Sequence, residues 1–300
     1  MRFAVLGNCQ TGTIADCIAL YFPGAEVVRY ASGNPATAER AAGIAEELHG
    51  FDHVFAHAEM SERMGPLRHA ILRETHPRTV FMPGVAFSGF QPDCIYLADA
   101  KGTLPSPVEV YHSALAAAAF TLGLEEERAV SLFNALVFSR LGYFDEHAKA
   151  SGAMVAHFRR MGYEIGERLP LWQRDRPFMY TINHPRCIVL ADIARLALEK
   201  AGFTPPEMPD VSDVLGDPLS RMPIFPLYPE IGRRLGLPGH YFFRDTIRGD
   251  QPMRPLDLPL FVARSFEIYR GMPERVSEAV ERHPRAKPAA EALKAMLRLG

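Results

Sequence analysis

Near its N-terminus the chain reads Arg2-Phe3-Ala4-Val5-Leu6-Gly7-Asn8-Cys9-Gln10-Thr11-Gly12-Thr13. A short apolar run ends at Gly7 and is followed by three polar side chains, one of which is a thiol. Apolar residues then recur at helical spacing, at Ile14, Cys17, Ile18 and Tyr21. The pattern predicts a buried strand, a tight turn and a helix. In an open α/β sheet such a turn lies at the carboxyl ends of the strands, where ligands bind.

The residue types of this turn suit acyl chemistry. A helix start offers unpaired N–H groups to an oxyanion and favours the thiolate, so we expect a lowered pKa for Cys9. The amides of Asn8 and Gln10 add hydrogen-bond donors. A cysteine near a strand end is also often a core residue, which is the alternative for Cys9. The turn has neither the Gly-Lys-Ser/Thr of a Walker A loop nor the second glycine of a dinucleotide-binding turn.

Composition narrows the class of protein. The chain has 300 residues, of which 48% are hydrophobic and 23% charged, as in ordinary soluble globular proteins. A net charge of -2 without a basic block argues against a nucleic-acid binder. No stretch approaches the length of a transmembrane segment, and the first apolar run is too short for a signal peptide. We therefore expect a cytoplasmic protein.

The cysteines indicate neither a metal site nor a disulfide framework. They are Cys9, Cys17, Cys94 and Cys187, and none forms a C-x-x-C pair. A structural zinc site is therefore not expected, and disulfides are not expected in a reducing compartment. Cys17 falls on the apolar stripe of the first helix, so we predict that it is a core residue.

Strand and helix patterns alternate over the first hundred residues. Strands are predicted at Phe3–Leu6, Glu26–Tyr30, His53–Ala56 and Thr79–Met82. Helices are predicted at Thr13–Phe22, Pro35–Leu48 and Ser61–Glu74. This order favours a parallel, doubly wound sheet. We assign residues 1–104 to a Rossmann-like α/β domain, and the chain to the α/β class.

A long loop follows the fourth predicted strand, at residues 83–97. Loops of this length are often functional, and this one is expected at the same sheet edge as the Cys9 turn. Ser88, Asp93 and Tyr96 either line a pocket there or cap local turns. The sequence favours neither alternative.

The remainder, residues 105–300, is predicted to form a mainly helical domain that completes the site. Residues 107–162 have a helical pattern whose first helix starts at Ser106-Pro107, a cap followed by proline. On that helix Glu109 and His112 would share a face, which suits an oriented general base but is also common by chance. Residues 258–300 are predicted to form amphipathic helices.

A second candidate base lies further along the chain. A β-prone run ends in Asn183-His184-Pro185, and a helix pattern follows. Side chains just before a helix start often face a ligand. We predict His184 as a general base and Asn183 as a helix cap or ligand donor, although a histidine before proline is often only a turn residue.

Four motifs occur in order along the chain: Gly7-Asn8-Cys9-Gln10, the Phe90–Leu97 segment, Tyr111-His112-Ser113 and Asn183-His184-Pro185. As a set they resemble the WcbI-type polysaccharide biosynthesis proteins, acetyltransferases of bacterial capsule assembly, over roughly residues 1–230. The resemblance implies a Rossmann-like core joined to a helical part, and binding of coenzyme A or its adenosine 3′,5′-bisphosphate portion. It implies a sugar of a surface polysaccharide as the acyl acceptor. The first strand, turn and helix also resemble, more distantly, SGNH hydrolases, with Asn8-Cys9 in place of their Asp-Ser.

These expectations combine into one leading hypothesis, an acyl-CoA-dependent O-acyltransferase. Its catalytic residues would be Cys9 with His184 or His112, and Lys101 and Arg186 would bind the 3′-phosphate of coenzyme A. The oxyanion and substrate-binding residues would be Gly7, Asn8, Gln10, Ser88, Tyr111, Ser113 and Asn183. The alternatives are an esterase or thioesterase, and a non-catalytic coenzyme A-binding component that works with other polysaccharide-assembly enzymes.

Overall fold

Four parallel strands form the sheet in the computed structural model, which describes residues 1–208, 211–250 and 252–298. They lie in the order β2-β1-β3-β4. Their bounds are β1 Arg2–Gly7, β2 Glu26–Ala31, β3 His53–His57 and β4 Thr79–Met82. All three strand pairs are parallel. The predicted α/β class and the four predicted strands are therefore confirmed.

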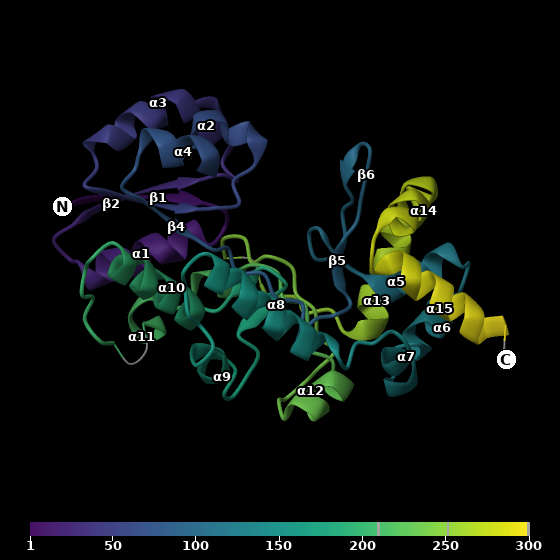
Figure 1. Cartoon of the computed structure of the whole chain (residues 1–300). Coiled ribbons are helices and arrows are strands. Elements are labelled where there is room, and N and C mark those ends of the chain that lie inside the picture. Colours follow the sequence, from purple (N-terminus) through teal and green to yellow (C-terminus); the bar gives the residue numbers. More distant parts are fainter. Residues whose placement is uncertain (209–210, 251, 299–300) are drawn as a thin grey trace. The chain divides into compact units, whose positions relative to one another are not determined.

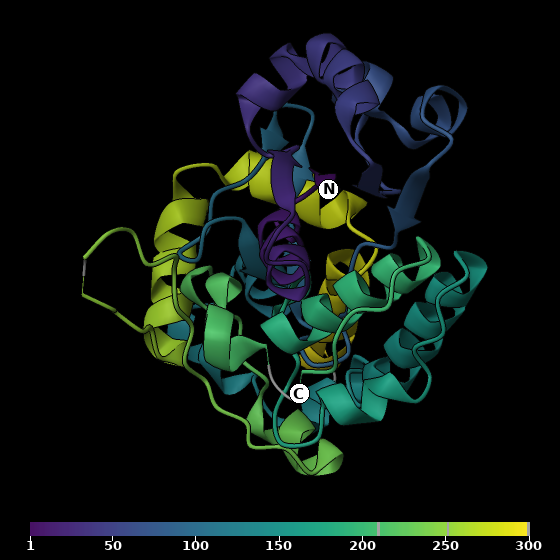
Figure 2. The same cartoon turned by 90° about the vertical axis from the view of Figure 1, so that its left-hand side faces the viewer.

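Alternating side chains of the two central strands bury both faces of the sheet. Ala4 and Leu6 of β1 pack in one cluster with Ile44 and Leu72. Phe3, on the opposite face, makes edge-to-face contacts with the rings of Phe55, Phe22 and Phe203. A parallel sheet covered on both faces needs such apolar runs. Figures 1 and 2 show the two covering layers, with α2, α3 and α4 on one side and α1 and α10 on the other.

The first predicted helix forms, whereas the helices predicted at Pro35–Leu48 and Ser61–Glu74 are each divided into shorter ones. Their bounds are α1 Thr11–Tyr21, α2 Pro35–Glu39, α3 Ala41–Glu47, η1 Leu48–Gly50, η2 Glu62–Leu67 and α4 His69–Thr75. The single helix predicted over 61–74 is wrong. Gly65 takes a left-handed φ of 48° and Pro66 follows it, so the chain cannot continue one helix there.

The chain forms two compact units, each built from separated segments. Unit 1 comprises Met1–Ala86, Ala153–Trp172 and His184–Leu219, and unit 2 comprises Phe87–Gly152, Gln173–Asn183 and Ser220–Gly300, apart from the residues outside the described ranges. The predicted division at residue 104 stays a prediction. The units of the structure follow a different partition, because the chain leaves unit 1 after Ala86 and returns to it twice.

Unit 2 is mainly helical. Helices α13, α14 and α15 gather around α5 (Figure 1). The bounds of the helices that belong wholly to this unit are α5 Ala114–Thr121, α6 Glu126–Ser131, α7 Ala135–Arg140, α12 Pro229–Leu235, α13 Leu258–Arg270, α14 Pro273–Arg282 and α15 Ala286–Arg298. Helices were predicted over 258–300, and those that form end at Arg298; Leu299 and Gly300 lie outside the described residues.

Short strands and further helices complete the described chain. The strands are β5 Cys94–Tyr96, β6 Ala98–Asp99, β7 Gly102–Thr103, β8 Tyr111–Ser113, β9 Met179–Thr181 and β10 His184–Pro185. The helices are α8 Glu146–Arg160, α9 Arg168–Trp172, α10 Cys187–Lys200, α11 Ser212–Leu215 and η3 Pro218–Arg221.

The helix predicted to start at Ser106-Pro107 is wrong. The Ser106 hydroxyl accepts a hydrogen bond from Val108 N–H, which closes a turn, and Glu109 has a left-handed φ of 61° that no α-helix allows. Tyr111 to Ser113 instead form β8, antiparallel to β5. The helix begins only at α5, whose N-cap is Ser113.

Candidate functional site

The Cys9 turn joins β1 to α1 at the carboxyl edge of the sheet. The Asn8 side-chain oxygen accepts a hydrogen bond from Gln10 N–H at 2.9 Å, and the Asn8 carbonyl accepts one from Thr11 N–H at 3.1 Å. Within this turn Cys9 is exposed, whereas Gln10 is buried. Cys17 is buried in the core, as predicted.

The expectation of a lowered pKa for Cys9 is wrong. Desolvation by surrounding protein atoms raises the thiol pKa, and a hydrogen bond from its own backbone N–H only partly opposes this. Helix α1 begins at Thr11, beyond Cys9, and Asn8 already accepts from the Gln10 and Thr11 N–H groups. These N–H groups at the helix start are therefore already hydrogen-bonded within the turn, and they stabilise a Cys9 thiolate little.

Gln10 links the turn to the segment after β4. Its side-chain Nε2 donates to the Val85 carbonyl at 2.8 Å, and its Oε1 accepts from Val85 N–H at 3.0 Å. Two bonds between a buried amide and one backbone residue fix the distance between these loops. The loop after β4 thus starts at the sheet edge of the Cys9 turn, as predicted. The expected role of Gln10 as an oxyanion donor stays a prediction.

His57 is a site residue that the sequence did not reveal. It is the last residue of β3 and is 1% exposed, and neither ring nitrogen has a hydrogen-bond partner among the described residues. A Cβ atom on Gly7 would lie 2.7 Å from two ring carbons of His57 and 2.8 Å from Thr11 Oγ1. Gly7 therefore lets the imidazole lie directly against the backbone of the turn. Burial lowers the His57 pKa to about 4, so the ring is neutral at pH 7.

A polar niche surrounds Gly84, just after β4. We define it by three atoms around the position that a Gly84 Cβ would occupy: Glu59 Oε2 at 3.3 Å, Asn8 Nδ2 at 3.6 Å and His57 Nδ1 at 3.6 Å. Glu59 Oε2 also accepts from Gly84 N–H at 3.1 Å. A carboxylate, an amide and an imidazole thus converge on one point beside the Cys9 turn. The buried Thr11 hydroxyl nearby has no partner among the described residues either.

Comparison with known proteins identifies the family and supports the fold. The family model "Polysaccharide biosynthesis enzyme WcbI" matches residues 2–206, more than half of the chain. The chain belongs to this family. A solved structure of a WcbI polysaccharide biosynthesis enzyme shares its fold, with a TM-score of 0.65 at 16% sequence identity, over 97% of this chain and 98% of that one. That structure is described as the native protein without a disulfide bond between coenzyme A and one of its cysteines. No curated protein matches the chain.

In this WcbI-family chain the other predicted site residues divide between the two units. His184 and Arg186 belong to unit 1, with the Cys9 turn, and Ser88, Tyr111, His112, Ser113, Asn183 and Lys101 belong to unit 2. His184 is 3% exposed, and burial lowers its pKa to about 4. Arg186 occupies the N-cap position of α10, so Asn183 is not the cap as expected.

His112 lies inside unit 2 and has partners on both sides of its ring. Its Nδ1 lies 2.9 Å from the Tyr269 hydroxyl, and its Nε2 lies 3.0 Å from the Leu104 carbonyl. Burial lowers its pKa to about 4. The predicted pairing with Glu109 on one helix face is wrong, because the Glu109 carboxylate accepts from Thr246 and Arg248 instead. The catalytic role of His112 stays a prediction.

The remaining polar predictions of unit 2 have defined contacts. Tyr111 donates its hydroxyl hydrogen bond to Asn183 Oδ1 at 2.7 Å, and Ser88 donates to Glu146 at 2.6 Å. Lys101 is exposed in the turn between β6 and β7. Their binding roles stay predictions.

For Asp93 the sequence left open whether it lines a pocket or caps a turn, and the structure places it in the core. It is fully buried and accepts hydrogen bonds from Tyr143 Oη at 2.7 Å, Tyr228 Oη at 2.7 Å and Leu115 N–H at 2.9 Å. Burial raises its pKa, while these donors and Ser113 oppose the rise. Asp93 therefore holds the start of α5 inside the core.

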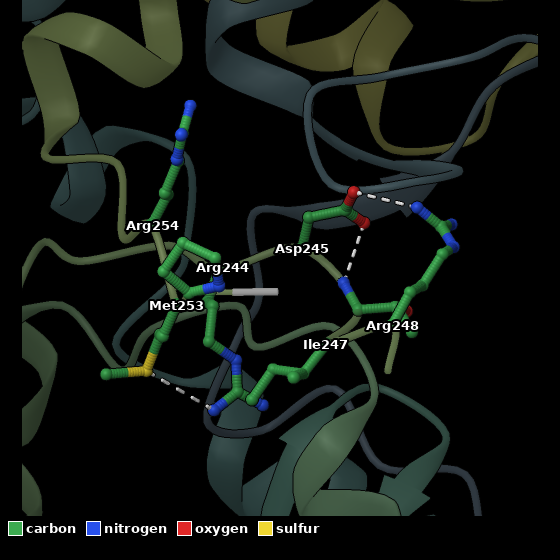
Figure 3. A pocket seen from close by; sticks show the side chains of 8 residues that line it. Arg244, Asp245, Ile247, Arg248, Met253 and Arg254 are labelled. Carbon is green, nitrogen blue, oxygen red and sulfur yellow. Dashed lines mark hydrogen bonds and ion pairs between the residues drawn. The ribbon is translucent and has the colours of Figure 1, made fainter. Parts of the chain in front are cut away.

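A pocket of about 470 Å³ in unit 2 contains none of the predicted residues. Figure 3 shows one ion pair among its charged side chains, between Asp245 and Arg248. Arg248 pairs with Asp245 at 3.5 Å, and Arg244 contacts Met253 Sδ at 4.0 Å, while Arg254 points away from them. The buried Nε of Arg244 has no hydrogen-bond partner among the described residues, and none of the residues predicted from sequence lies near it in this pocket.

Two further findings concern the described residues only. No group of three or more His, Cys, Asp or Glu side chains is placed to hold a metal ion. No helix in the described part of the chain combines the length and apolar composition needed to cross a membrane.

Proposed function

We propose that this WcbI-family protein is an acyl-CoA-dependent O-acyltransferase that transfers an acetyl group to a sugar hydroxyl in capsular or other surface polysaccharide biosynthesis. The family supplies the biosynthetic context. The coenzyme A and the cysteine named for the related structure support the donor. We place the reaction in the cytoplasm, as the sequence predicts.

One observation carries the proposal: an exposed thiol belongs to a turn that also contacts buried polar groups without partners among the described residues. Cys9 is exposed on the turn, while His57 and Thr11 are buried beside Gly7 with unpaired nitrogens and an unpaired hydroxyl. Buried polar groups are normally hydrogen-bonded, so unpaired ones at the carboxyl edge of a parallel sheet favour a ligand that supplies the missing bonds.

The reaction would proceed in two acyl transfers. The Cys9 thiol gives its proton to a histidine, and its Sγ attacks the thioester carbonyl carbon. The bond from that carbon to the coenzyme A sulfur breaks, and the leaving thiolate takes the proton from the imidazolium. A sugar hydroxyl then loses its proton to the histidine and attacks the acyl group. Cys9 leaves as the thiolate and recovers that proton.

The roles of individual residues follow from their chemistry. His184 remains the base predicted from sequence and His112 its substitute, while the niche adds His57, whose neutral ring can accept a proton at pH 7. Asn8 Nδ2 in the niche would donate to the oxyanion. Lys101 and Arg186 are assigned to the 3′-phosphate of coenzyme A, and Ser88, Tyr111, Ser113 and Asn183 to the sugar.

The test uses intact-protein mass spectrometry after incubation with acetyl-CoA alone. We expect one acetyl group on the wild type and none on Cys9→Ser, because the other three cysteines are buried. Transfer to a panel of sugars should fall at least about 100-fold in Cys9→Ser and in His57→Phe. Cys17→Ala, which keeps the exposed thiol, is the matched control. Wild-type transfer by Cys9→Ser would contradict the covalent role.

The raised pKa of Cys9 favours a second candidate, a non-catalytic coenzyme A-binding component of polysaccharide assembly. A thiol that resists ionisation is a weaker nucleophile. Calorimetric titration with coenzyme A and adenosine 3′,5′-bisphosphate separates the cases. Binding without acetyl transfer to any sugar supports the second candidate, and release of free acetate without an acceptor supports a thioesterase. Absence of binding would contradict both coenzyme A-dependent proposals.

A further inference from the structure

A basic cavity lies along the edge strand β4 of unit 1. Its volume is about 660 Å³, and it extends from His53 and Thr79, at the starts of β3 and β4, to Ala58 and Phe81. Strand β4 is at the end of the sheet order, so on one side it pairs with no other strand of the described chain. The size is in the usual range for small-molecule sites.

Four cationic residues line this basic cavity, and no aspartate or glutamate does. They come from four different segments: Arg73 from α4, Arg78 from just before β4, Arg160 from the end of α8 and Lys200 from the end of α10. The Lys200 ammonium donates to the Met161 carbonyl at 2.5 Å and lies 4.6 Å from the Tyr163 ring centre, which holds it over the cavity.

The three arginines differ from most of their neighbours in having no anionic partner. Within the described chain, Arg73, Arg78 and Arg160 make neither an ion pair nor a side-chain hydrogen bond. Other arginines of unit 1 do pair: Arg2 with Glu26 at 2.8 Å and Arg168 with Asp192 at 2.7 Å. Repulsion among unpaired cations in one cavity costs stability that an anion would restore.

Three imidazoles add hydrogen-bonding groups to the wall, from His53, His69 and His76. Burial lowers the pKa of His53 and His76, so these rings are neutral at pH 7 and add polarity without charge. Asp52 lines a neighbouring cavity, where its carboxylate accepts from Arg2 N–H at 2.7 Å.

Edge protection is the other explanation for cations on an edge strand, because charged side chains prevent strands of other molecules from pairing. It needs charges on the strand itself. Here none of the four cations belongs to β4, and they converge on a cavity instead. We propose that the basic cavity binds a ligand with two adjacent phosphate groups. Guanidinium groups match phosphate oxygens in a bidentate geometry, and several cations suit the charge of a diphosphate better than that of one phosphate.

Calorimetric titration with inorganic pyrophosphate tests the site. We expect the wild type to bind pyrophosphate more tightly than orthophosphate, and the triple variant Arg73→Gln, Arg78→Gln, Arg160→Gln to bind it at least about tenfold more weakly. The three side chains are exposed, so the fold should survive, which thermal unfolding checks. Arg63→Gln, an exposed arginine of η2 outside the cavity, is the matched control.

Three results would overturn the proposal: no binding of pyrophosphate, equal binding of orthophosphate, or unchanged binding by the triple variant. Two sources share the diphosphate chemistry, and competition distinguishes them. Displacement of pyrophosphate by coenzyme A assigns the cavity to the donor, and displacement by UDP-glucose alone assigns it to a nucleotide-linked sugar. Cys9→Ser should bind pyrophosphate as the wild type does, so this site can stand if the proposed acyl transfer fails.

Discussion

Two histidines of this protein are equally buried but differ in their hydrogen bonds. Burial lowers the pKa of His57 and of His112 to about 4 in both cases. His112 in unit 2 has a partner at each ring nitrogen, whereas His57 beside the Cys9 turn has none among the described residues. A satisfied buried group specifies a fold, and an unsatisfied one costs stability unless a ligand completes it. The pKa alone does not separate these roles.

The largest loss of stability should follow the removal of a buried group that has hydrogen-bond partners. Asp93→Ala leaves the hydroxyls of Tyr143 and Tyr228 and one backbone N–H unpaired in the core, so we expect a loss of about 4 kcal/mol in the free energy of unfolding. Thr11→Val is the control, because the buried Thr11 hydroxyl has no partner to lose among the described residues, and its change should stay within about 1 kcal/mol. Urea denaturation measures both. Equal losses of stability in the two variants would show that the hydrogen-bond partners of Asp93 do not account for its effect.

The histidines themselves give the second effect. His112→Phe strands the Tyr269 hydroxyl and the Leu104 carbonyl, whereas His57→Phe strands nothing in the described protein. Both substitutions enlarge the ring alike, so their difference isolates the hydrogen bonds. We expect His112→Phe to be less stable than His57→Phe by about 2 kcal/mol in denaturant titrations at pH 8. A difference near zero would mean that water already satisfies both rings.

The third effect is a pH dependence that the two sites should share. Unfolded histidine binds a proton near pH 6.5, whereas the folded rings do so only near pH 4. The stabilising contribution is complete above pH 6.5 and is lost as the pH falls toward 4, by at most about 1.4 kcal/mol per pH unit for each ring.

Variants test this sharing directly. Between pH 6.5 and 4 the free energy of unfolding should fall less steeply in His57→Phe and in His112→Phe than in the wild type. The slope should decrease by the same amount in both variants, despite their unequal stabilities at pH 8. Stability measured at several pH values in one buffer series would show it. A flatter slope in only one variant would show that the other ring titrates normally.

The sequence predicted the unit 1 strands well because parallel strands carry uninterrupted apolar runs and glycine marks the turn at Gly7. It failed between Ser106 and Ser113 for a physical reason. Strand β8 and helix α5 are both buried, so apolar residues at helical spacing do not distinguish them, and the left-handed φ of Glu109 leaves no mark on composition.

The site itself was only half visible in the sequence. Cys9 and Asn8 follow the first strand directly, so local pattern reveals them. His57 lies 50 residues from Gly7, and Val85 lies 75 from Gln10, so only the fold brings them together. One signal was available: His57 is a polar residue at the carboxyl end of a parallel strand, where ligands bind. The predicted strand ended one residue too early to include it.

The smallest expected effect on stability, combined with a clear effect on transfer, should come from Gly84→Ala. The new methyl group would lie 3.3 Å from Glu59 Oε2 and 3.6 Å from His57 Nδ1, which fills the polar niche. Gly84 lacks a left-handed φ, so alanine is conformationally acceptable and the free energy of unfolding should change by less than about 1 kcal/mol. If the niche holds a reacting group, kcat/KM for acetyl transfer should fall at least about tenfold, because small displacements of reacting atoms are costly. Gly33→Ala, where a Cβ meets open space, should change neither quantity. Full transfer by Gly84→Ala would mean that His57 takes no part in catalysis. The two histidines would then differ in their hydrogen-bond partners only.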